Sequence, residues 1–294
     1  MQETLEPLDK TVIISRILTF SCVDGPGNRL VLFLQGCNFN CLSCHNPHTI
    51  NYCQHCHDCV PGCPTAALHI NSDNKVVWDK TLCIHCDQCT DDCSHNANPK
   101  TSRYSVVELI QIIRQHRHFI GGITVSGGEA TMQLPFIIVL FQAIKESSDL
   151  CHLTCFIDSN GYLPEKAWRR VLPWLDGAMI DLKAWQTETH RWLTGRNNHR
   201  VIHSIRYLAS VGKLHELRLL HIPEKSDLER EVENIANLIQ ELPGSVQIRL
   251  NAFQHHGVTG EALAWEICDK ETILAFHQQL RTRVEHTLLL PRAY

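Results

Sequence analysis

The chain has 294 residues, 44% of them hydrophobic, and a formal net charge of −4, which suits one large domain or a core domain that carries a smaller insert. Basic residues are neither in excess nor gathered in long runs, so the composition argues against a nucleic-acid-binding protein. No apolar run reaches the roughly 20 residues that span a bilayer, and the polar start MQETLEPLDK is unlike a secretory signal, so we expect a cytoplasmic protein with no membrane span.

Fifteen cysteines are many for a protein without an export signal, and eleven of them fall between Cys37 and Cys93. Disulfides are rare in a reducing cytosol, so this density indicates metal binding. We interpret the remaining four cysteines as small buried apolar residues. They are Cys22, Cys151, Cys155 and Cys268.

A short apolar run, RLVLFLQG at Arg29–Gly36, predicts a buried parallel strand that leads directly into a cysteine loop. In this loop, CNFNCLSC, a C-x3-C-x2-C pattern is formed by Cys37, Cys41 and Cys44. Three thiolates can hold three corners of a four-iron cube, and no fourth cysteine belongs to the motif. One iron would therefore be left open, and an open iron is a site for a substrate.

The next segment repeats a C-x2-C-x2-C-x3-C run, first as CQHCHDCVPGC and then as CIHCDQCTDDC. This is the spacing of two-cluster ferredoxins, in which the fourth cysteine of each run ligates the cluster of the other run. The pattern predicts one cluster on Cys53, Cys56, Cys59 and Cys93, and a second on Cys83, Cys86, Cys89 and Cys63. Structural zinc is the alternative, but zinc sites usually use two cysteine pairs with a longer spacer, which this repeat fits poorly.

Five further apolar runs follow and alternate with segments of helical periodicity. The predicted strands are Gly121–Gly128, Leu153–Gly161, Gly177–Lys183, Leu214–Ile222 and Val246–Phe253, and helices are expected at 105–116, 135–148 and 229–242. Strands that alternate with helices imply a parallel sheet with crossover helices. The sequence therefore predicts an α/β fold, a partial (β/α)6 TIM-like barrel formed by residues 1–51 and 97–294. Residues 52–96 are predicted to form a ferredoxin-like insert.

The cysteine loop, with SCVDGPGNRLVLFLQGC (Ser21–Cys37) before it and His45-Asn46-Pro47 after it, resembles the radical S-adenosylmethionine superfamily. Within that superfamily the chain is most similar to the activating enzymes of glycyl radical enzymes that carry a ferredoxin-like insert. The resemblance implies that the open iron chelates the amino and carboxylate groups of S-adenosylmethionine. It also implies three [4Fe–4S] clusters, an anaerobic setting and, as in some members, a monovalent cation.

Polar residues follow the predicted strands at their carboxyl ends, where a barrel places its active site. Ser126–Glu129 matches the family's GGE motif, which holds the cofactor's amino group, although a tight loop with a solvated glutamate is the alternative for SGGE alone. At the next two strand ends, DSNG (Asp158–Gly161) and DLK (Asp181–Lys183) match family motifs that bind the nucleoside and carboxylate end of the cofactor. The cofactor contacts that the resemblance implies are Ser43, His45, Gly127, Gly128, Glu129, Asp158, Ser159, Asn160, Met179, Asp181, Lys183, Arg218 and His255.

Two of these assignments carry alternatives. Arg218 is matched by an arginine that contacts the cofactor, and a salt-bridged barrel arginine is the other interpretation. Many relatives have a histidine where this chain has Gln254, and we expect His255 to take its place.

The resemblance implies that the reduced cluster cleaves S-adenosylmethionine to a 5′-deoxyadenosyl radical, which abstracts hydrogen from a glycine of a partner glycyl radical enzyme. A flavodoxin or ferredoxin is the implied electron donor, and the implied peptide-docking residues are Asp24, Gly25, Pro26, Gly27 and Arg29. Two alternatives remain. The chain could be a radical enzyme for a small molecule, or an electron-transfer protein whose barrel is a scaffold.

Overall fold

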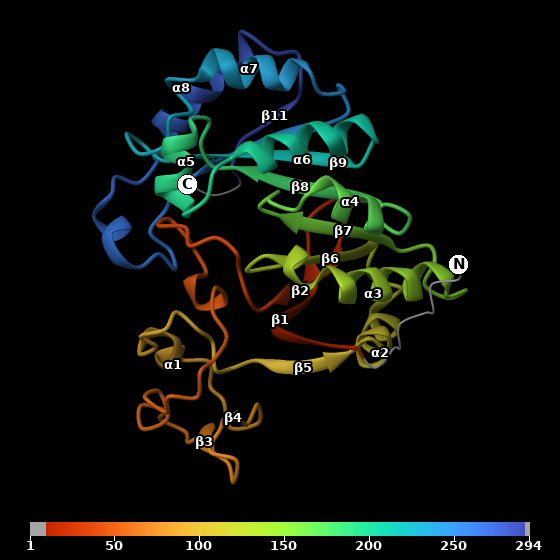
Figure 1. Ribbon diagram of the computed structural model, residues 1–294, viewed down its shortest axis with the longest axis vertical. Coiled ribbons are helices and arrows are strands. Elements are labelled where there is room, and N and C mark those ends of the chain that lie inside the picture. The colour runs from red at the N-terminus through yellow and green to blue at the C-terminus, as the bar shows by residue number, and fades with distance from the viewer. Residues whose placement is uncertain (1–9, 292–294) are drawn as a thin grey trace.

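The computed structural model describes residues 10–291, and a single nine-stranded sheet organises most of them (Figure 1). The strand order is β11-β10-β9-β8-β7-β6-β2-β1-β5, and every pairing from β2 to β11 is parallel. The parallel strands are β2 (Arg29–Leu34), β6 (Gly122–Gly127), β7 (Thr154–Ser159), β8 (Gly177–Leu182), β9 (Leu214–His221), β10 (Gln247–Ala252) and β11 (Leu288–Leu289). The predicted mixed α/β fold with six principal parallel strands is thus confirmed.

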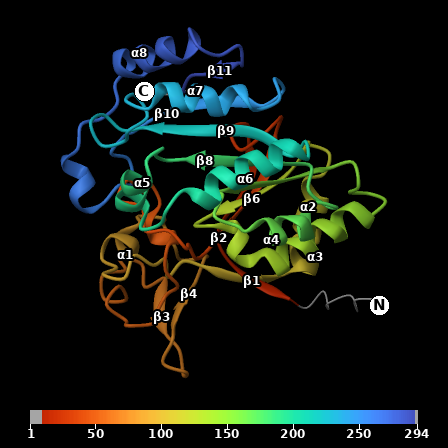
Figure 2. The ribbon, with the colours of Figure 1, turned by 45° about the horizontal axis from the view of Figure 1, so that its top comes forward.

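Helices connect successive parallel strands and cover the outside of the sheet (Figures 1 and 2). They are α2 (Val106–His116), α3 (Leu134–Glu146), α4 (Glu165–Val171), α5 (Thr187–Thr194), α6 (His199–Ser210), α7 (Val232–Gln240) and α8 (Lys270–Arg281). The first begins with a capping box, in which the Ser105 hydroxyl and the Glu108 carboxylate satisfy each other's backbone amides. None of the helices in residues 10–291 has the length and apolarity to cross a membrane.

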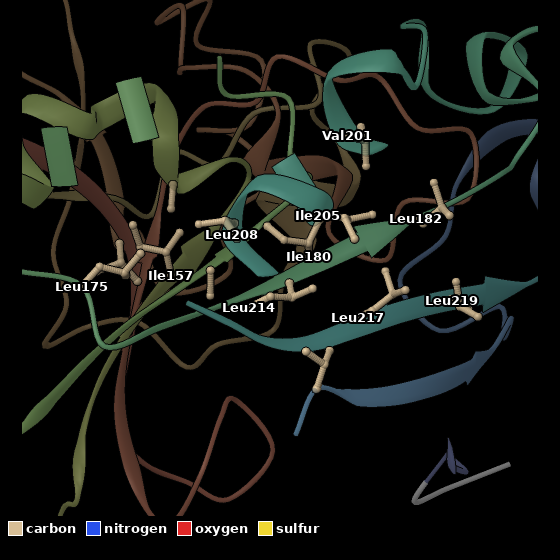
Figure 3. Close-up of a cluster of buried hydrophobic side chains, with 14 of the residues drawn as sticks. Ile157, Leu175, Ile180, Leu182, Val201, Ile205, Leu208, Leu214, Leu217 and Leu219 are labelled. Atoms are coloured by element: carbon tan, nitrogen blue, oxygen red, sulfur yellow. The ribbon is translucent and has the colours of Figure 1, made fainter. Parts of the chain in front are cut away.

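The core lies between these helices and the sheet. Figure 3 shows Val201, Ile205 and Leu208 of α6 facing side chains of β8 and β9 such as Ile180 and Leu217. All five are buried. Because the strands from β2 to β11 pair in parallel, their carboxyl ends meet at one end of the sheet.

Two strands that the sequence did not predict extend the sheet beyond β2. β1 (Thr11–Ser21) pairs antiparallel with β2, and β5 (Ser102–Ser105) pairs antiparallel with β1. β1 alternates irregularly between exposed and buried side chains, and its register with β2 shifts twice. A strand of this kind has neither the continuous apolar run nor the strict alternation on which sequence patterns depend.

Residues 52–96 lie apart from the sheet and protrude below it in Figure 1. They contain a hairpin of β3 (Leu68–Ile70) and β4 (Val76–Trp78), the short helix α1 (Gln88–Asp91) and a small hydrophobic cluster of their own. A bridge between Asn51 and Ala97 joins the two ends of the segment. The chain therefore leaves the barrel and returns to it at neighbouring positions.

The four scattered cysteines divide into two pairs. Cys155 and Cys268 are buried, as expected, but Cys22 and Cys151 are exposed, so the interpretation of these two as core residues is wrong. Cys22 lies in the loop after β1 and Cys151 in the turn after α3. Both are surface connections, where a small apolar side chain has no core to enter.

Candidate active site

A cavity of about 710 Å³ opens at the carboxyl ends of the parallel strands. It lies between the cysteine loop on one side and the ends of β6 to β10 on the other. Of the residues predicted to act here, those that line it are Asp24, Cys37, Cys41, Ser43, Cys44, His45, Gly127, Gly128, Glu129, Asp158, Ser159, Asn160, Asp181, Lys183 and Arg218.

The cysteine loop is held in place by its backbone. The amide of Leu42 donates to the carbonyl of Leu193 (2.9 Å), near the end of α5. The amide of Asn40 donates to the carbonyl of Thr194 (3.0 Å). Phe39 packs edge-on against His190, also of α5, with ring centroids 5.7 Å apart. These contacts place the thiols of Cys37, Cys41 and Cys44 on one wall of the cavity.

The environment of these thiols suits a metal cluster. Burial raises the pKa of Cys37 and of Cys41 to about 12, and at Cys41 the nearby Lys183 only partly offsets it. Thiolates at such positions need a neighbouring positive charge, which bound iron supplies. The three-cysteine loop therefore fits the [4Fe–4S] cluster predicted for it.

The end of β6 and the residue after it approach the end of β2 too closely for any side chain larger than a hydrogen atom. Gly127 has φ +122°, and a Cβ there would lie 2.2 Å from the carbonyl oxygen of Leu34. A Cβ on Gly128 would lie 2.4 Å from the carbonyl oxygen of Gly36. The two glycines thus let the backbone pass beside the cluster loop and carry Glu129 into the cavity wall.

Glu129 is 2% exposed, so the interpretation of SGGE as a loop with a solvated glutamate is wrong for this chain. Its carboxylate accepts hydrogen bonds from the amide of Asn160 (2.7 Å), the hydroxyl of Ser159 (2.8 Å) and the amide of Thr131 (3.0 Å). Burial outweighs these donors and raises the pKa of Glu129. A cationic ligand group placed against this carboxylate would relieve that cost.

Opposite charges alternate along the floor of the cavity. Arg218 donates to Asp158 (3.0 Å) and to Glu216 (2.6 Å), and Lys183 donates to Asp181 (3.0 Å). Burial raises the pKa of Asp158 despite Arg218, whereas at Asp181 the two cationic side chains outweigh burial and lower it. Cationic side chains of the chain itself therefore offset the repulsion between these two aspartates. Arg218 forms salt bridges, as one interpretation had it, and it also lines the cavity, while its contact with the cofactor stays a prediction.

Sequence reasoning missed part of this floor. Arg249 and Asn251 of β10 line the cavity, and Arg249 pairs with Glu216 (2.9 Å), which Arg218 also contacts. A signal was present, because Glu216 and Arg218 on β9, and Arg249 and Asn251 on β10, each stand two residues apart and so share one face of a strand.

Several predicted residues lie outside the cavity lining. Met179 is buried behind Arg218, and the His255 ring donates to the carbonyl of Trp265 (2.8 Å). The expectation that His255 takes the place of the missing histidine is therefore not met by the arrangement of its side chain. Gln254 does not fill that role either, since its amide donates to the carbonyl of Cys268 (3.0 Å).

The DGPG sequence lies in the loop of residues 22–28, and of this loop only Val23 and Asp24 line the cavity. Arg29 is fully buried, with its guanidinium donating to the hydroxyls of Thr124 (2.7 Å) and Thr154 (2.9 Å) and to the carbonyl of Pro26 (3.2 Å). Its side chain thus holds the loop from inside and offers no surface to a peptide. Gly25, Pro26 and Gly27 are likewise absent from the cavity lining.

Two smaller cavities lie within residues 52–100, each lined by four cysteines. One is lined by Cys53, Cys56, Cys59 and Cys93, and the other by Cys63, Cys83, Cys86 and Cys89. These are the two sets predicted from the ferredoxin spacing, with the fourth cysteine exchanged. Within residues 10–291 no three Cys, His, Asp or Glu side chains converge closely enough to hold one metal ion. The cysteine spacing still predicts an iron–sulfur cluster at each of these two sets.

The fold and the three-cysteine cavity define a class of protein. Residues 31–239 match the model of the radical SAM superfamily, and the chain belongs to that superfamily. Membership implies a [4Fe–4S] cluster and S-adenosylmethionine as cofactors.

Several curated proteins that are similar to this chain over most of its length are activating enzymes. A 4-hydroxyphenylacetate decarboxylase activating enzyme of Clostridioides difficile (strain CD196) is 29% identical over 83% of this chain and 82% of its own length. An isethionate sulfite-lyase activating enzyme of Nitratidesulfovibrio vulgaris is 29% identical over 90% of this chain and 93% of its own. A pyruvate formate-lyase-activating enzyme of Streptococcus mutans is 27% identical over 79% and 73%. The resemblance predicted from the cysteine loop and its flanks is confirmed, while the two-cluster insert stays a prediction.

Solved structures agree on the fold. QueE from Escherichia coli is similar over 96% of this chain and 94% of its own, with a TM-score of 0.55 and 12% identity. SuiB of Streptococcus suis, bound to its precursor peptide, covers 94% of this chain over 50% of its own, with a TM-score of 0.53 and 15% identity. At these identities the likeness concerns the partial barrel alone.

Proposed function

We propose that this protein is an activating enzyme that produces a radical on a glycine of a partner glycyl radical enzyme. The observation that carries the proposal is the cavity in which three half-buried thiols face the buried carboxylate of Glu129. The activating enzymes among the relatives, matched over most of their length, support the choice of partner.

In this proposal Cys37, Cys41 and Cys44 hold three irons and leave the fourth for S-adenosylmethionine. When bound, the cluster and S-adenosylmethionine supply the 5′-deoxyadenosyl radical that takes a hydrogen atom from the glycine. Glu129 is suited to accept a hydrogen bond from the ammonium group, because its Oε2 accepts only the amide of Asn160, and a carboxylate oxygen has capacity for more than one donor.

The remaining lining positions the cofactor and limits the access of water. Lys183 and Arg218 place positive charge beside a carboxylate ligand, and Ser159 and Asn160 offer hydroxyl and amide groups at the end of β7. Phe33 and Phe39 add apolar surface, which excludes water from the reacting groups. Asp158 and Asp181 already have cationic partners, so the proposed function needs no monovalent cation.

We extend the proposal to the insert, residues 52–96, as a carrier of two further [4Fe–4S] clusters on the two cysteine sets described above. The exchange of the fourth cysteine between the sets supports this assignment. A flavodoxin or ferredoxin is the proposed electron donor.

The test begins with the yield of 5′-deoxyadenosine from anaerobically reconstituted, reduced protein given S-adenosylmethionine. Cys41→Ala should abolish the yield, and Cys151→Ala, at an exposed site away from the cavity, should leave it unchanged. No 5′-deoxyadenosine from protein with its full iron and sulfide content would contradict the proposal and favour an electron-transfer protein.

The partner is tested separately. Incubation with 4-hydroxyphenylacetate decarboxylase or with isethionate sulfite-lyase should give a glycyl radical doublet in the electron paramagnetic resonance spectrum. Cleavage of S-adenosylmethionine without a doublet on either competent protein would favour a radical enzyme for another substrate.

A further inference from the structure

Tyr52 lies on the backbone of Gly36. A Cβ built on Gly36 would be 2.7 Å from the phenolic oxygen of Tyr52 and 2.9 Å from the carbon that bears it. Gly36 has φ +103°, a conformation that favours glycine. The end of the tyrosine ring therefore occupies the space that any larger residue at position 36 would fill.

This contact brings together the residues that directly precede two cysteine-rich segments. Gly36 precedes Cys37, the first cysteine of the active-site loop, and Tyr52 precedes Cys53, the first cysteine of the insert. Gly36 and Tyr52 are in van der Waals contact, and each is followed directly by one of these two cysteines.

Hydrogen bonds make the junction rigid. The amide of Cys37 donates to the carbonyl of Ile50 (2.9 Å), and the amide of Gly36 donates to the carbonyl of Thr49 (2.8 Å). The Tyr52 hydroxyl accepts a hydrogen bond from Gln133 (2.7 Å), which lies just before α3. The ring is therefore fixed from both sides, and a second connection runs from Cys37 through Ile50 and the backbone to Cys53.

We infer that Tyr52 is the bridge through which one electron passes between the insert and the active site. The inference rests on the proposed function, and it assigns the inner position of the relay to the cluster set of Cys53, Cys56, Cys59 and Cys93. For each electron that crosses, the insert cluster is oxidised by one electron and the active-site cluster is reduced by one. The external reductant is a low-potential one-electron donor protein, and no proton or leaving group is involved.

A purely structural role for Tyr52 makes a different prediction. If the ring only supported the junction, its loss would weaken cluster assembly or stability and leave electron transfer unchanged. A useful test therefore measures transfer in protein that has been shown to contain all its clusters.

The test runs the transfer in reverse, from the reduced active-site cluster through the insert to an external oxidant. Photoreduced, fully loaded protein is mixed with excess ferric cytochrome c, an acceptor too large to enter the cavity. Decay of the reduced active-site cluster is followed by freeze-quench electron paramagnetic resonance, its signal being recognised by its change when S-adenosylmethionine is added. Oxidised benzyl viologen, which is small enough to enter the cavity, serves as the control acceptor.

Tyr52→Leu should slow the decay with cytochrome c severalfold and leave the decay with benzyl viologen unchanged. Tyr52→Phe, which keeps the ring but loses the bond to Gln133, should stay close to wild type. Cys56→Ala, which removes a ligand of the inner cluster without touching the contact, should slow the decay as Tyr52→Leu does.

Equal decay in Tyr52→Leu and wild type with cytochrome c would overturn the inference, as would fast decay in Cys56→Ala. Slowing with both acceptors would show that the substitution alters the active-site cluster itself rather than the connection to the insert, and would overturn the inference as well. Failure of the proposed function is seen separately, as the absence of 5′-deoxyadenosine from chemically reduced wild-type protein.

Discussion

The carboxylate of Glu129 accepts a hydrogen bond from the backbone amide of Asn160 (2.7 Å), so one buried acid ties the loop after β6 to the loop after β7. Glu129→Gln would turn an amide group toward donors that now meet carboxylate oxygens. We expect unfolding to become easier by about 1–3 kcal/mol, with weaker binding of S-adenosylmethionine.

Urea unfolding and equilibrium dialysis with S-adenosylmethionine measure these two effects. Glu271→Gln, at an exposed position in the first turn of α8, is the matched control. Unchanged binding in Glu129→Gln would show that this carboxylate does not hold the ligand's amino group.

Arg29 is predicted to stabilise the DGPG loop from below. Arg29→Lys would keep the charge but lose the planar guanidinium, which now donates to Thr124, Thr154 and Pro26 and stacks over Phe156 at 4.4 Å. We expect a loss of about 1–3 kcal/mol in the free energy of unfolding, because buried acceptors are left unpaired.

Urea unfolding checks the energy, and limited proteolysis at the loop, residues 22–28, checks its order. Arg16→Lys, at an exposed position on β1, should change neither. If both arginine variants behave alike, the buried guanidinium is not what holds the loop.

Acid should destabilise the packing beneath the cysteine loop through His190. Burial and Lys183 lower the pKa of His190 below its usual 6.5, although the carbonyl of Arg196 accepts its Nδ1 proton and opposes the shift. Its Nε2 is buried without a partner, so a second proton would have no acceptor. A histidine whose pKa is lowered in the folded state makes its full contribution to the free energy of unfolding above pH 6.5. That free energy falls as the pH drops below 6.5.

Urea midpoints measured at pH 7.5 and at pH 5.5 test this expectation. His190→Gln should show a smaller difference between the two, and His118→Gln, on the surface, should resemble wild type. An identical pH dependence in all three proteins would exclude His190 as a source of it.

Removal of iron should affect the insert before the barrel. The small hydrophobic cluster of residues 52–96 has only four buried members, Cys59, Leu68, Val76 and Cys89, and two of them are proposed ligands. So small a core cannot stabilise a segment of this length without metal. Trypsin should therefore cleave at Lys75 and Lys80 much faster after chelation.

Mass spectrometry of the early fragments distinguishes the two regions. Cleavage confined to the insert is the expected result, because the barrel has its own large core. Equal resistance of loaded and chelated protein would mean that the cysteine sets do not hold the insert together.

The six parallel strands could be predicted because each is a short, continuous apolar run next to a glycine or a polar strand end. The cysteine sets could be predicted because spacing along a short loop almost determines which thiols can converge. β1 could not, since its exposed and buried residues follow no regular period. Sequence order also shows that His255 follows a strand, but it does not show where its side chain points.

The structure shows that direction, because the His255 ring donates to the carbonyl of Trp265. At Gly257, φ is +73°, and a Cβ would lie 2.1 Å from the carbonyl oxygen of His45, so the chain after β10 turns sharply against the cysteine loop. That turn is a long-range contact between segments more than 200 residues apart, and no local pattern announces it. The pairing of Arg249 with Glu216 across two strands has the same origin.

The bridge between Asn51 and Ala97 has a further consequence. Because both ends of the insert leave the barrel at one place, a short linker could span the gap, and the entropic cost of closing so small a loop is modest. The two ends of the insert thus meet the barrel side by side. Under the proposed function, exchange of its six aspartates and two lysines for another charge pattern would change the choice of redox partner and leave the catalytic barrel the same.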